Sequence, residues 1–280
     1  MAIRIVQSKG NERVKELRYA LRQHRSATSG IVGLEGIHLL EEALRAGIEV
    51  VTVFVAQGHE HLVSQPPLAD FSLADSVEIL ALPRQLLDHT ATTETPQPIA
   101  ALVRPRSWKW PRLLTGPSPL LVVLSGVQDP GNLGTILRSA EAFAATGAAL
   151  LPGTVSRWNA KTMRASAGSV FRLPMLTATD QECFEQLRKA GVQTLAAMPR
   201  EENSITPSFG SLNLTRPTAL FIGSEGSGLA PEIADQCDAR ITIPCPGPVE
   251  SLNAAVAASI LLYEASRQRA LPASKHSRRR

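Results

Sequence analysis

The sequence is poor in aromatic residues and cysteine, and it has no long apolar run. Aromatic side chains make up only 4% of its 280 residues, so a broad platform for stacking nucleotide bases is not evident. Cys183, Cys237 and Cys245 lack the spacing of a metal site and cannot all pair internally, which indicates reduced thiols. No apolar run reaches the ~18 residues of a membrane span. We therefore expect neither a membrane anchor nor a bound metal.

Two further absences narrow the range of functions. The first nine residues lack the apolar core of a secretory signal peptide, so we expect a cytoplasmic protein. The glycine patterns of dinucleotide-binding and ATP-binding loops are also missing, which argues against an NAD-dependent oxidoreductase on a Rossmann-like sheet. A formal net charge of +4 mildly favours a polyanionic partner.

A proline-rich stretch divides the chain, whose length indicates roughly two domains. Residues 104–119 contain four prolines and a glycine, which interrupt regular structure. Trp108 and Trp110 alternate there with basic side chains. They either stack on RNA or pack the linker onto a domain, and the second interpretation is favoured. The predicted parts are a first domain over 1–104, a linker over 105–118, a second domain over 119–270 and a basic disordered tail over 271–280.

The first domain shows alternating helix and strand patterns, which predict a small α/β fold. Residues 8–26 predict a helix with a basic face, which either contacts RNA phosphates or is simply solvated. Residues 33–47 predict a second helix that ends at Gly47. Strands are predicted over residues 50–56, 77–82 and 99–103.

The second domain reads as a parallel α/β sheet. Residues 120–125 form a nearly continuous apolar run, typical of a strand covered on both faces. A loop over 126–134 and a helix over 135–145 follow. Residues 254–262 carry almost no charge, which predicts a helix buried all round and capped by Ser251 or Asn253. Further strands are predicted over 148–151, 169–175, 192–197, 218–223 and 239–244, and further helices over 180–190, 230–236 and 253–269.

Three loops of this domain carry the residues suited to chemistry. In an open parallel sheet, ligands bind at the carboxyl ends of the strands, where such loops lie. After the first strand, Asn132 and Arg138 are placed to reach a ligand, although an ordinary capped surface helix would look the same. In the glycine-rich second loop, Glu225 would repel a phosphate, so a neutral or cationic small molecule is favoured. The third loop is rigid, because three prolines precede the helix.

The order and spacing of these loops resemble a known family. The segments Asn132-Leu-Gly-Thr-Ile-Leu-Arg138-Ser-Ala, Ile222-Gly-Ser-Glu-Gly-Ser-Gly-Leu229 and Ile243–Ala257 are similar to the three motifs of the SpoU (TrmH) RNA ribose 2′-O-methyltransferases, in the SPOUT superfamily. The likeness covers residues 119–269. The N-terminal part, with Leu34-Glu-Gly and Thr95-Pro-Gln-Pro-Ile, resembles the family's RNA substrate-binding domain. Cys245 and Pro98 depart from the usual Met and Gly.

The resemblance implies a SPOUT methyltransferase domain with a C-terminal trefoil knot, preceded by a small α/β RNA substrate-binding domain. It also implies S-adenosylmethionine as cofactor and a homodimer. The catalytic positions it implies are Asn132, Arg138, Glu225, Ser251 and Asn253. The cofactor-binding positions are Leu220, Ile222, Gly223, Ile243, Leu252 and Ala254.

The implied reaction moves a methyl group to a ribose 2′-hydroxyl of RNA. Ribosomal RNA is favoured over transfer RNA because the two-domain layout resembles the ribosomal members. A non-catalytic RNA-binding or ribosome-assembly factor is the alternative, and a role in antibiotic resistance stays open. Arg164 either contacts RNA or is ordinary surface structure. The candidate RNA-binding residues are Lys9, Arg13, Arg18, Arg22 and Arg164.

Overall fold

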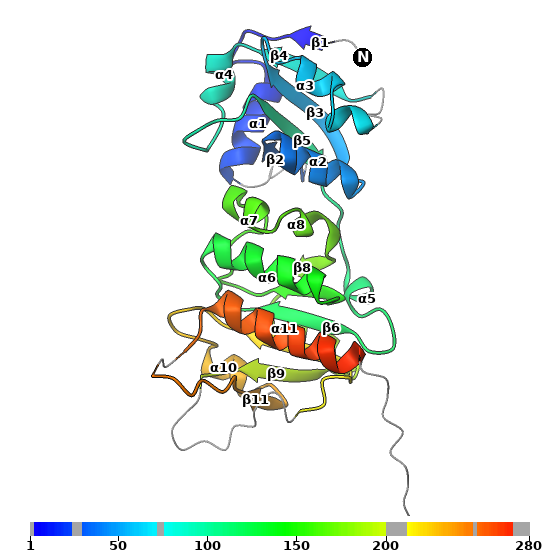
Figure 1. Ribbon diagram of the computed structural model, residues 1–280, viewed down its shortest axis with the longest axis vertical. Coiled ribbons are helices and arrows are strands. Elements are labelled where there is room, and N and C mark those ends of the chain that lie inside the picture. Colours follow the sequence, from blue (N-terminus) through cyan, green and yellow to red (C-terminus); the bar gives the residue numbers. More distant parts are fainter. Residues whose placement is uncertain (1–2, 24–29, 72–75, 200–211, 249–250, 271–280) are drawn as a thin grey trace, which may run out of the picture. The chain divides into compact units, whose positions relative to one another are not determined.

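A computed structural model gives the fold of most of the chain (Figure 1). It describes residues 3–23, 30–71, 76–199, 212–248 and 251–270. The chain forms two compact units, a first unit of residues 1–107 and 156–172 and a second unit of residues 108–155 and 173–280. The predicted tail over 271–280 lies outside the described residues.

The first unit is built on a mixed five-stranded sheet in the order β1-β4-β3-β5-β2. Strands β1, β4 and β3 run parallel, whereas β5 runs antiparallel to both of its neighbours. Helix α1 buries Val14 and Leu17 in a cluster with Phe54, Leu80 and Leu102 of the sheet. The strands are β1 (Ile3–Ile5), β2 (Val32–Glu35), β3 (Glu49–Ala56), β4 (Glu78–Leu82) and β5 (Ile99–Arg104). The helices are α1 (Glu12–Gln23), α2 (Ile37–Arg45), α3 (His61–Ser64), η1 (Leu68–Asp70) and α4 (Arg84–Asp88).

Residues 156–172 also pack in the first unit, although the sequence assigned them to the second domain. They contain α7 (Ala160–Ala165) and α8 (Ser169–Arg172). The Arg172 guanidinium forms an ion pair with Glu42 of α2, which holds this segment to the N-terminal residues. The proposed limits of the domains stay a prediction in other respects.

The predicted strand over 169–175 is wrong for most of its length. Residues 169–172 form α8, and β8 begins only at Met175. The Ser166 hydroxyl accepts a hydrogen bond from the Val170 N–H at 3.4 Å, so a local side-chain contact favours the helical turn over an extended chain. An apolar run of this length does not distinguish the two.

The second unit is a six-stranded sheet in the order β11-β9-β10-β6-β7-β8, and all of its strands are parallel. This confirms the predicted parallel α/β sheet. The strands are β6 (Leu120–Leu124), β7 (Gly147–Leu150), β8 (Met175–Thr177), β9 (Gln193–Ala197), β10 (Thr218–Ile222) and β11 (Ala239–Ile241). The helices are α5 (Trp110–Leu113), α6 (Pro130–Ala142), α9 (Asp180–Lys189), α10 (Pro231–Ala234) and α11 (Ala254–Ala270).

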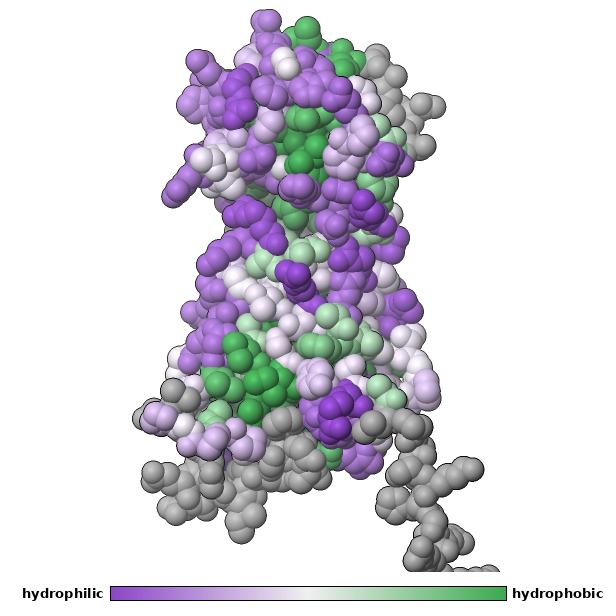
Figure 2. Space-filling view, viewed as in Figure 1, coloured by the Kyte–Doolittle hydropathy of each residue, from purple (hydrophilic) through white to green (hydrophobic). Residues whose placement is uncertain are grey.

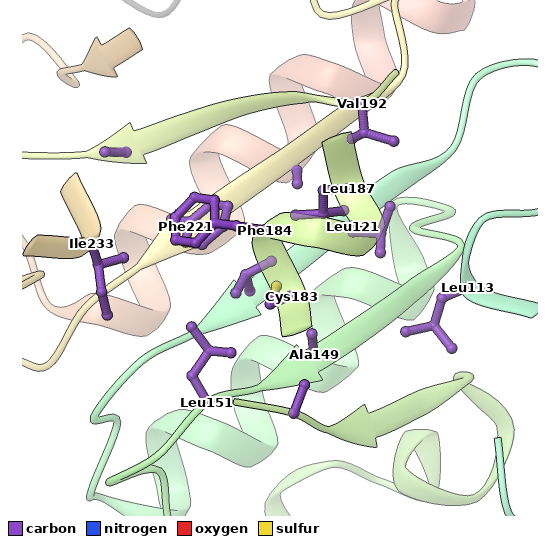
Figure 3. Close-up of a cluster of buried hydrophobic side chains, with 14 of the residues drawn as sticks. Leu113, Leu121, Ala149, Leu151, Cys183, Phe184, Leu187, Val192, Phe221 and Ile233 are labelled. Carbon is purple, nitrogen blue, oxygen red and sulfur yellow. The ribbon is translucent and has the colours of Figure 1, made fainter. Parts of the chain in front are cut away.

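One face of this sheet is covered by a tight hydrophobic cluster (Figure 3). Phe184 of α9 lies flat on Phe221 of β10, with ring centroids 5.0 Å apart. Trp110 is also buried there, and its indole N–H donates to the Glu182 carboxylate at 2.8 Å. The proline-rich stretch therefore forms one helical turn, α5, with Pro111 in its first turn. The interpretation that the tryptophans pack the linker onto a domain is confirmed for Trp110.

Helices α6 and α11 pack against each other in the same unit (Figure 1). Leu261 and Leu262 are fully buried, but Val256 is 47% exposed and Tyr263 is 53% exposed. The prediction that this helix is buried all round is therefore wrong, because only part of its circumference meets other elements of the single chain. Figure 2 shows the resulting apolar patch over the first turns of α11.

The far end of α11 is tied to the amino ends of two strands. The Arg269 guanidinium donates to the carbonyl oxygens of Ser118 at 2.6 Å, Arg216 at 2.8 Å and Leu214 at 2.9 Å. Each hydrogen bond to a charged group contributes about 1.5–3 kcal/mol. This end of the sheet is thus closed by structural contacts, and the carboxyl end is left for the loops.

The chemical inventory of the described residues is simple. None of their helices has the length and apolar character needed to cross a membrane. They contain no cluster of three or more His, Cys, Asp or Glu side chains that could hold a metal ion. The three cysteines form no disulfide. Burial raises the pKa of Cys183 and of Cys237 to about 12, so both thiols are protonated at neutral pH and are poor nucleophiles.

Candidate active site

The predicted loops meet at the point where the order of strands in the sheet reverses. The chain runs outward from β6 to β7 and β8, whereas β10 lies on the other side of β6. The Ser125 N–H donates to the Ile222 carbonyl at 3.0 Å, so the loops that follow β6 and β10 start side by side. A crevice at such a switch point is the usual ligand site of an open parallel sheet.

Helix α6 starts at Pro130, five residues before the predicted start. The Asp129 carboxylate accepts from the Asn132 N–H at 2.8 Å, which caps the helix. The loop predicted over 126–134 is therefore partly helical, because the glycines there suggested a turn. An Asp followed by Pro was the available signal for a helix start. Asn132 is thus fixed in the first turn of α6.

The loop after β10 is a closed turn. Ser224 and Gly228 exchange two backbone hydrogen bonds, at 3.0 and 3.1 Å, and the Ser224 and Ser227 hydroxyls lie 2.8 Å apart. A Cβ atom on Gly223 would lie 2.1 Å from the Gly228 carbonyl carbon. Glycine is thus required at 223 by the loop's own backbone, a reason that the sequence did not reveal. The turn leaves the Glu225 side chain exposed.

The third loop ends in a helix cap. The Asn253 side-chain oxygen accepts from the Ala255 N–H at 2.9 Å and from the Val256 N–H at 3.2 Å. Of the two predicted candidates, Asn253 therefore provides the cap of α11. Ser251 is exposed beside it. The two residues before Ser251 lie outside the described residues.

A chain of hydrogen bonds joins these three loops. The Asn253 amide nitrogen donates to the Asn132 side-chain oxygen at 3.1 Å, and the Asn132 amide nitrogen donates to the Glu225 carboxylate. Chemistry fixes both orientations, because a carboxylate only accepts and the Asn253 oxygen is occupied by backbone N–H groups. Amides do not move protons here, so these hydrogen bonds serve to orient the loops. The Glu225 carboxylate lies at the exposed end of the series.

Arg138 lies on the exposed side of α6, about one and a half turns beyond Asn132. Among the described residues, its guanidinium forms no hydrogen bond or ion pair. Nearby, the Ser139 and Ser259 hydroxyls are 2.7 Å apart and tie α6 to α11. Arg138 therefore presents a guanidinium on a helix whose position is fixed. A guanidinium can donate two parallel hydrogen bonds to an anionic ligand.

The predicted cofactor residues fall into two groups. Leu220, Ile222 and Ala254 are buried, and the first two alternate along β10 with side chains of the α9 cluster, so they face the α11 side of the sheet. Ile243 and Leu252 are partly exposed, whereas Gly223, directly after β10, is buried. Leu220 is a core side chain in the middle of a paired strand, whereas the partly exposed pair offers apolar surface to a ligand.

The charges around these loops fit a cationic cofactor. Up to the first turn of α6, and so leaving aside Arg138 farther along that helix, the described residues of the three loops carry two charged side chains, Asp129 and Glu225, and both are acidic. A phosphate would meet repulsion there, whereas a sulfonium beside neutral apolar walls would be attracted. S-adenosylmethionine carries such a sulfonium, so the residues present fit it.

The candidate RNA-binding cations all lie in the first unit. Arg13 forms ion pairs with Glu16 at 2.9 Å and Glu78 at 3.4 Å, so its charge is already compensated. The remaining side chains form no hydrogen bond or ion pair within the part of the chain that the structure describes. These side chains are Lys9, Arg18, Arg22 and Arg164.

Comparisons with known proteins agree with this geometry. Residues 119–263 match the SpoU rRNA Methylase family, and residues 11–101 match an MRM3-like substrate binding domain. A Synechocystis protein named an uncharacterized tRNA/rRNA methyltransferase is 35% identical over 266 residues, which cover 94% of this chain and 93% of that protein.

Two solved structures cover both units. An AdoMet-bound rRNA methyltransferase from Sinorhizobium meliloti is 29% identical, with a TM-score of 0.80, over 95% of this chain and 98% of that one. An RNA 2′-O ribose methyltransferase is 31% identical, with a TM-score of 0.74, over 95% of this chain and 100% of that one. The fold and the matched domains define an RNA methyltransferase with an N-terminal substrate-binding domain. The chain belongs to the SpoU family.

Gly223 and Gly226 provide a matched test of the turn after β10. We expect Gly223→Ala to lower the free energy of unfolding by about 3 kcal/mol, because its methyl group would overlap backbone atoms. Gly226→Ala should change it by less than about 0.5 kcal/mol, because that position has open space and no positive φ. Urea denaturation measures both. Equal stability of the two variants would contradict the closed turn.

Proposed function

We propose that this protein transfers a methyl group from S-adenosylmethionine to a ribose 2′-hydroxyl of ribosomal RNA. The observation that carries the proposal is the hydrogen-bond chain through Asn132, Glu225 and Asn253 at the switch point of the sheet. The names of the two similar structures, an rRNA methyltransferase with bound AdoMet and an RNA 2′-O ribose methyltransferase, support the cofactor and the position of methylation. Its expected place of action is the cytoplasm.

Ile243, Leu252 and the backbone around Gly223 would hold the cofactor, with Leu220, Ile222 and Ala254 forming the wall behind them. The cofactor supplies an electrophilic methyl group on a positively charged sulfur. Glu225 forms no ion pair within the described residues, so its carboxylate favours positive charge there. Backbone groups and apolar side chains do the rest of the binding.

The 2′-hydroxyl is a weak nucleophile and must lose its proton as the new bond forms. A guanidinium is not deprotonated in proteins, so Arg138 acts as a clamp for a phosphate and for the developing oxyanion. Asn132 and Asn253 orient the loops and the ribose. Glu225 holds the Asn132 amide, and Ser251 is exposed beside Asn253 as a substrate contact.

The RNA substrate would be held mainly by the first unit. Lys9, Arg18, Arg22 and Arg164 have no ion pair with the described residues, and phosphate contacts by such cations give salt-dependent affinity. Ribosomal RNA is proposed over transfer RNA because the first unit matches a substrate-binding domain and the similar AdoMet-bound structure is an rRNA methyltransferase. The alternative, a non-catalytic assembly factor, is disfavoured because all five candidate catalytic side chains are present.

The reaction is tested by incubating the protein with S-adenosylmethionine and unmodified ribosomal RNA, then searching the digest for methylated nucleosides by mass spectrometry. We expect one new 2′-O-methylnucleoside. Arg138→Lys should slow its formation about 100-fold, because the charge remains but the fork is lost. Arg112→Lys, an exposed arginine of α5, is the matched control and should be neutral. A base-methylated product, or full activity of Arg138→Lys, would contradict the proposal.

We also propose the homodimer and the trefoil knot that the family resemblance implies. The contact between Asn253 and Asn132, 121 residues apart, places the third loop beside the first, and the knot itself rests on the family resemblance. The exposed Val256 and Tyr263 on α11 support a dimer contact, since large apolar side chains there are left in solvent by the single chain.

Sedimentation velocity tests the dimer. We expect Val256→Asp to convert a dimer to a folded monomer, because the buried contact would receive a charge. Ile5→Asp changes a side chain that is 63% exposed in the other unit and should leave the dimer unchanged. A wild-type monomer, or a dimer that survives Val256→Asp, would refute this interface.

A further inference from the structure

Tyr19 stands out on the outer face of α1. It is 47% exposed and makes no ring contact or hydrogen bond with the described residues. The only other tyrosine, Tyr263, lies edge-on against Phe143 with ring centroids 5.7 Å apart. An exposed aromatic ring without a partner is ordinary by itself, so the side chains around it decide its meaning.

Those neighbours are cations. Val14, Leu17 and Leu21 define the buried face of α1, and Tyr19 lies on the opposite side. Lys15, four residues before Tyr19, and Arg22, three residues after it, share that outer face. Arg18 lies beside them. None of the three cations has an ion pair or hydrogen bond in the described part of the chain.

The same helix also carries an ion pair whose charges compensate each other. Arg13 and Glu16 pair with each other, and Arg13 also pairs with Glu78 of β4. Two acidic side chains lie near this face: Glu12 at the start of the helix, and Glu16, three residues before Tyr19, whose charge is compensated by Arg13. The face around Tyr19 is therefore positive, and its only large apolar group is a single aromatic ring.

This combination fits single-stranded RNA better than other partners. Cations bind the phosphates, and an aromatic ring stacks on an unpaired base. A protein or membrane partner would need a wider apolar surface, and the outer face of α1 offers one ring. A base-paired helix would meet the cations and leave the ring unused, since its bases are stacked inside.

We propose that Tyr19 stacks on an unpaired base of the RNA substrate while Lys15, Arg18 and Arg22 bind the flanking phosphates. This rests on the proposed function, because it takes RNA to be the substrate. It adds a single-stranded segment as the structure recognised, and it adds Tyr19 and Lys15 to the candidate RNA-binding residues.

The test measures the affinity of the full-length protein for a fluorescent, unstructured RNA oligonucleotide and for its duplex. Tyr19→Ala and Tyr19→Leu should weaken single-strand binding about tenfold or more, and Tyr19→Phe should keep it, because stacking needs an aromatic ring. Binding of the duplex should not change. Gln65→Ala, an exposed residue outside α1, is the neutral control.

Salt dependence separates stacking from charge. Tyr19→Ala should leave the slope of log affinity against log salt unchanged, whereas Lys15→Ala and Arg22→Ala should each reduce it by about 0.7 for a single strand. Thermal unfolding should differ little among the Tyr19 variants, since the side chain is half exposed and makes no hydrogen bond or ring contact with the described residues.

Two results would overturn the assignment. If Tyr19→Ala binds like the wild type while the cation variants bind weakly, the contact is electrostatic alone, and the proposed function stands without it. If the wild type binds neither RNA and methylates none, the proposed function and this inference fail together.

Discussion

The side-chain amide of Asn132 is the contact on which the rest of the site depends. It accepts from Asn253 and donates to Glu225, so one residue joins loops that are distant in sequence. Its own backbone N–H is held by Asp129. These two side-chain amides can satisfy all of their hydrogen bonds in only one orientation, because the series ends in a carboxylate on one side and a helix cap on the other. The loops are therefore positioned together.

The sheet and its helices make this contact possible. Parallel pairing of β6 and β10 brings their carboxyl ends together, and the packing of α6 on α11 brings two helix starts to the same edge. Gly223 lets the turn after β10 close on itself, which places Glu225 opposite Asn132. Arg269 closes the other end of the sheet with backbone contacts. Positioning and stability are thus assigned to opposite ends of the same strands.

Sequence patterns predicted the parallel sheet, the three loops and their polar residues, because apolar runs and glycine turns are local signals. They failed where one local hydrogen bond chose a helix over a strand or turn, and where a distant contact decided the outcome. Residues 169–172 became a helix, and α11 kept an open face at Val256. The start of α6 was missed because Asp129 caps it through one hydrogen bond. The pairing of Asn132 with Glu225 could not be derived from spacing, since it depends on strand order. The family resemblance supplied the cofactor and the reaction, which no pattern contained.

If the hydrogen bonds through Asn132 position the loops together, the three loops act as one unit. A double-mutant cycle on the single-turnover rate of methyl transfer tests it most directly, with Asn132→Ala and Asn253→Asp as the single variants. Asp at 253 can still cap α11 but cannot donate to Asn132. The account predicts that the double variant is no slower than the slower single variant, because both changes break one chain. Losses that multiply would mean that the two residues act independently and would contradict it.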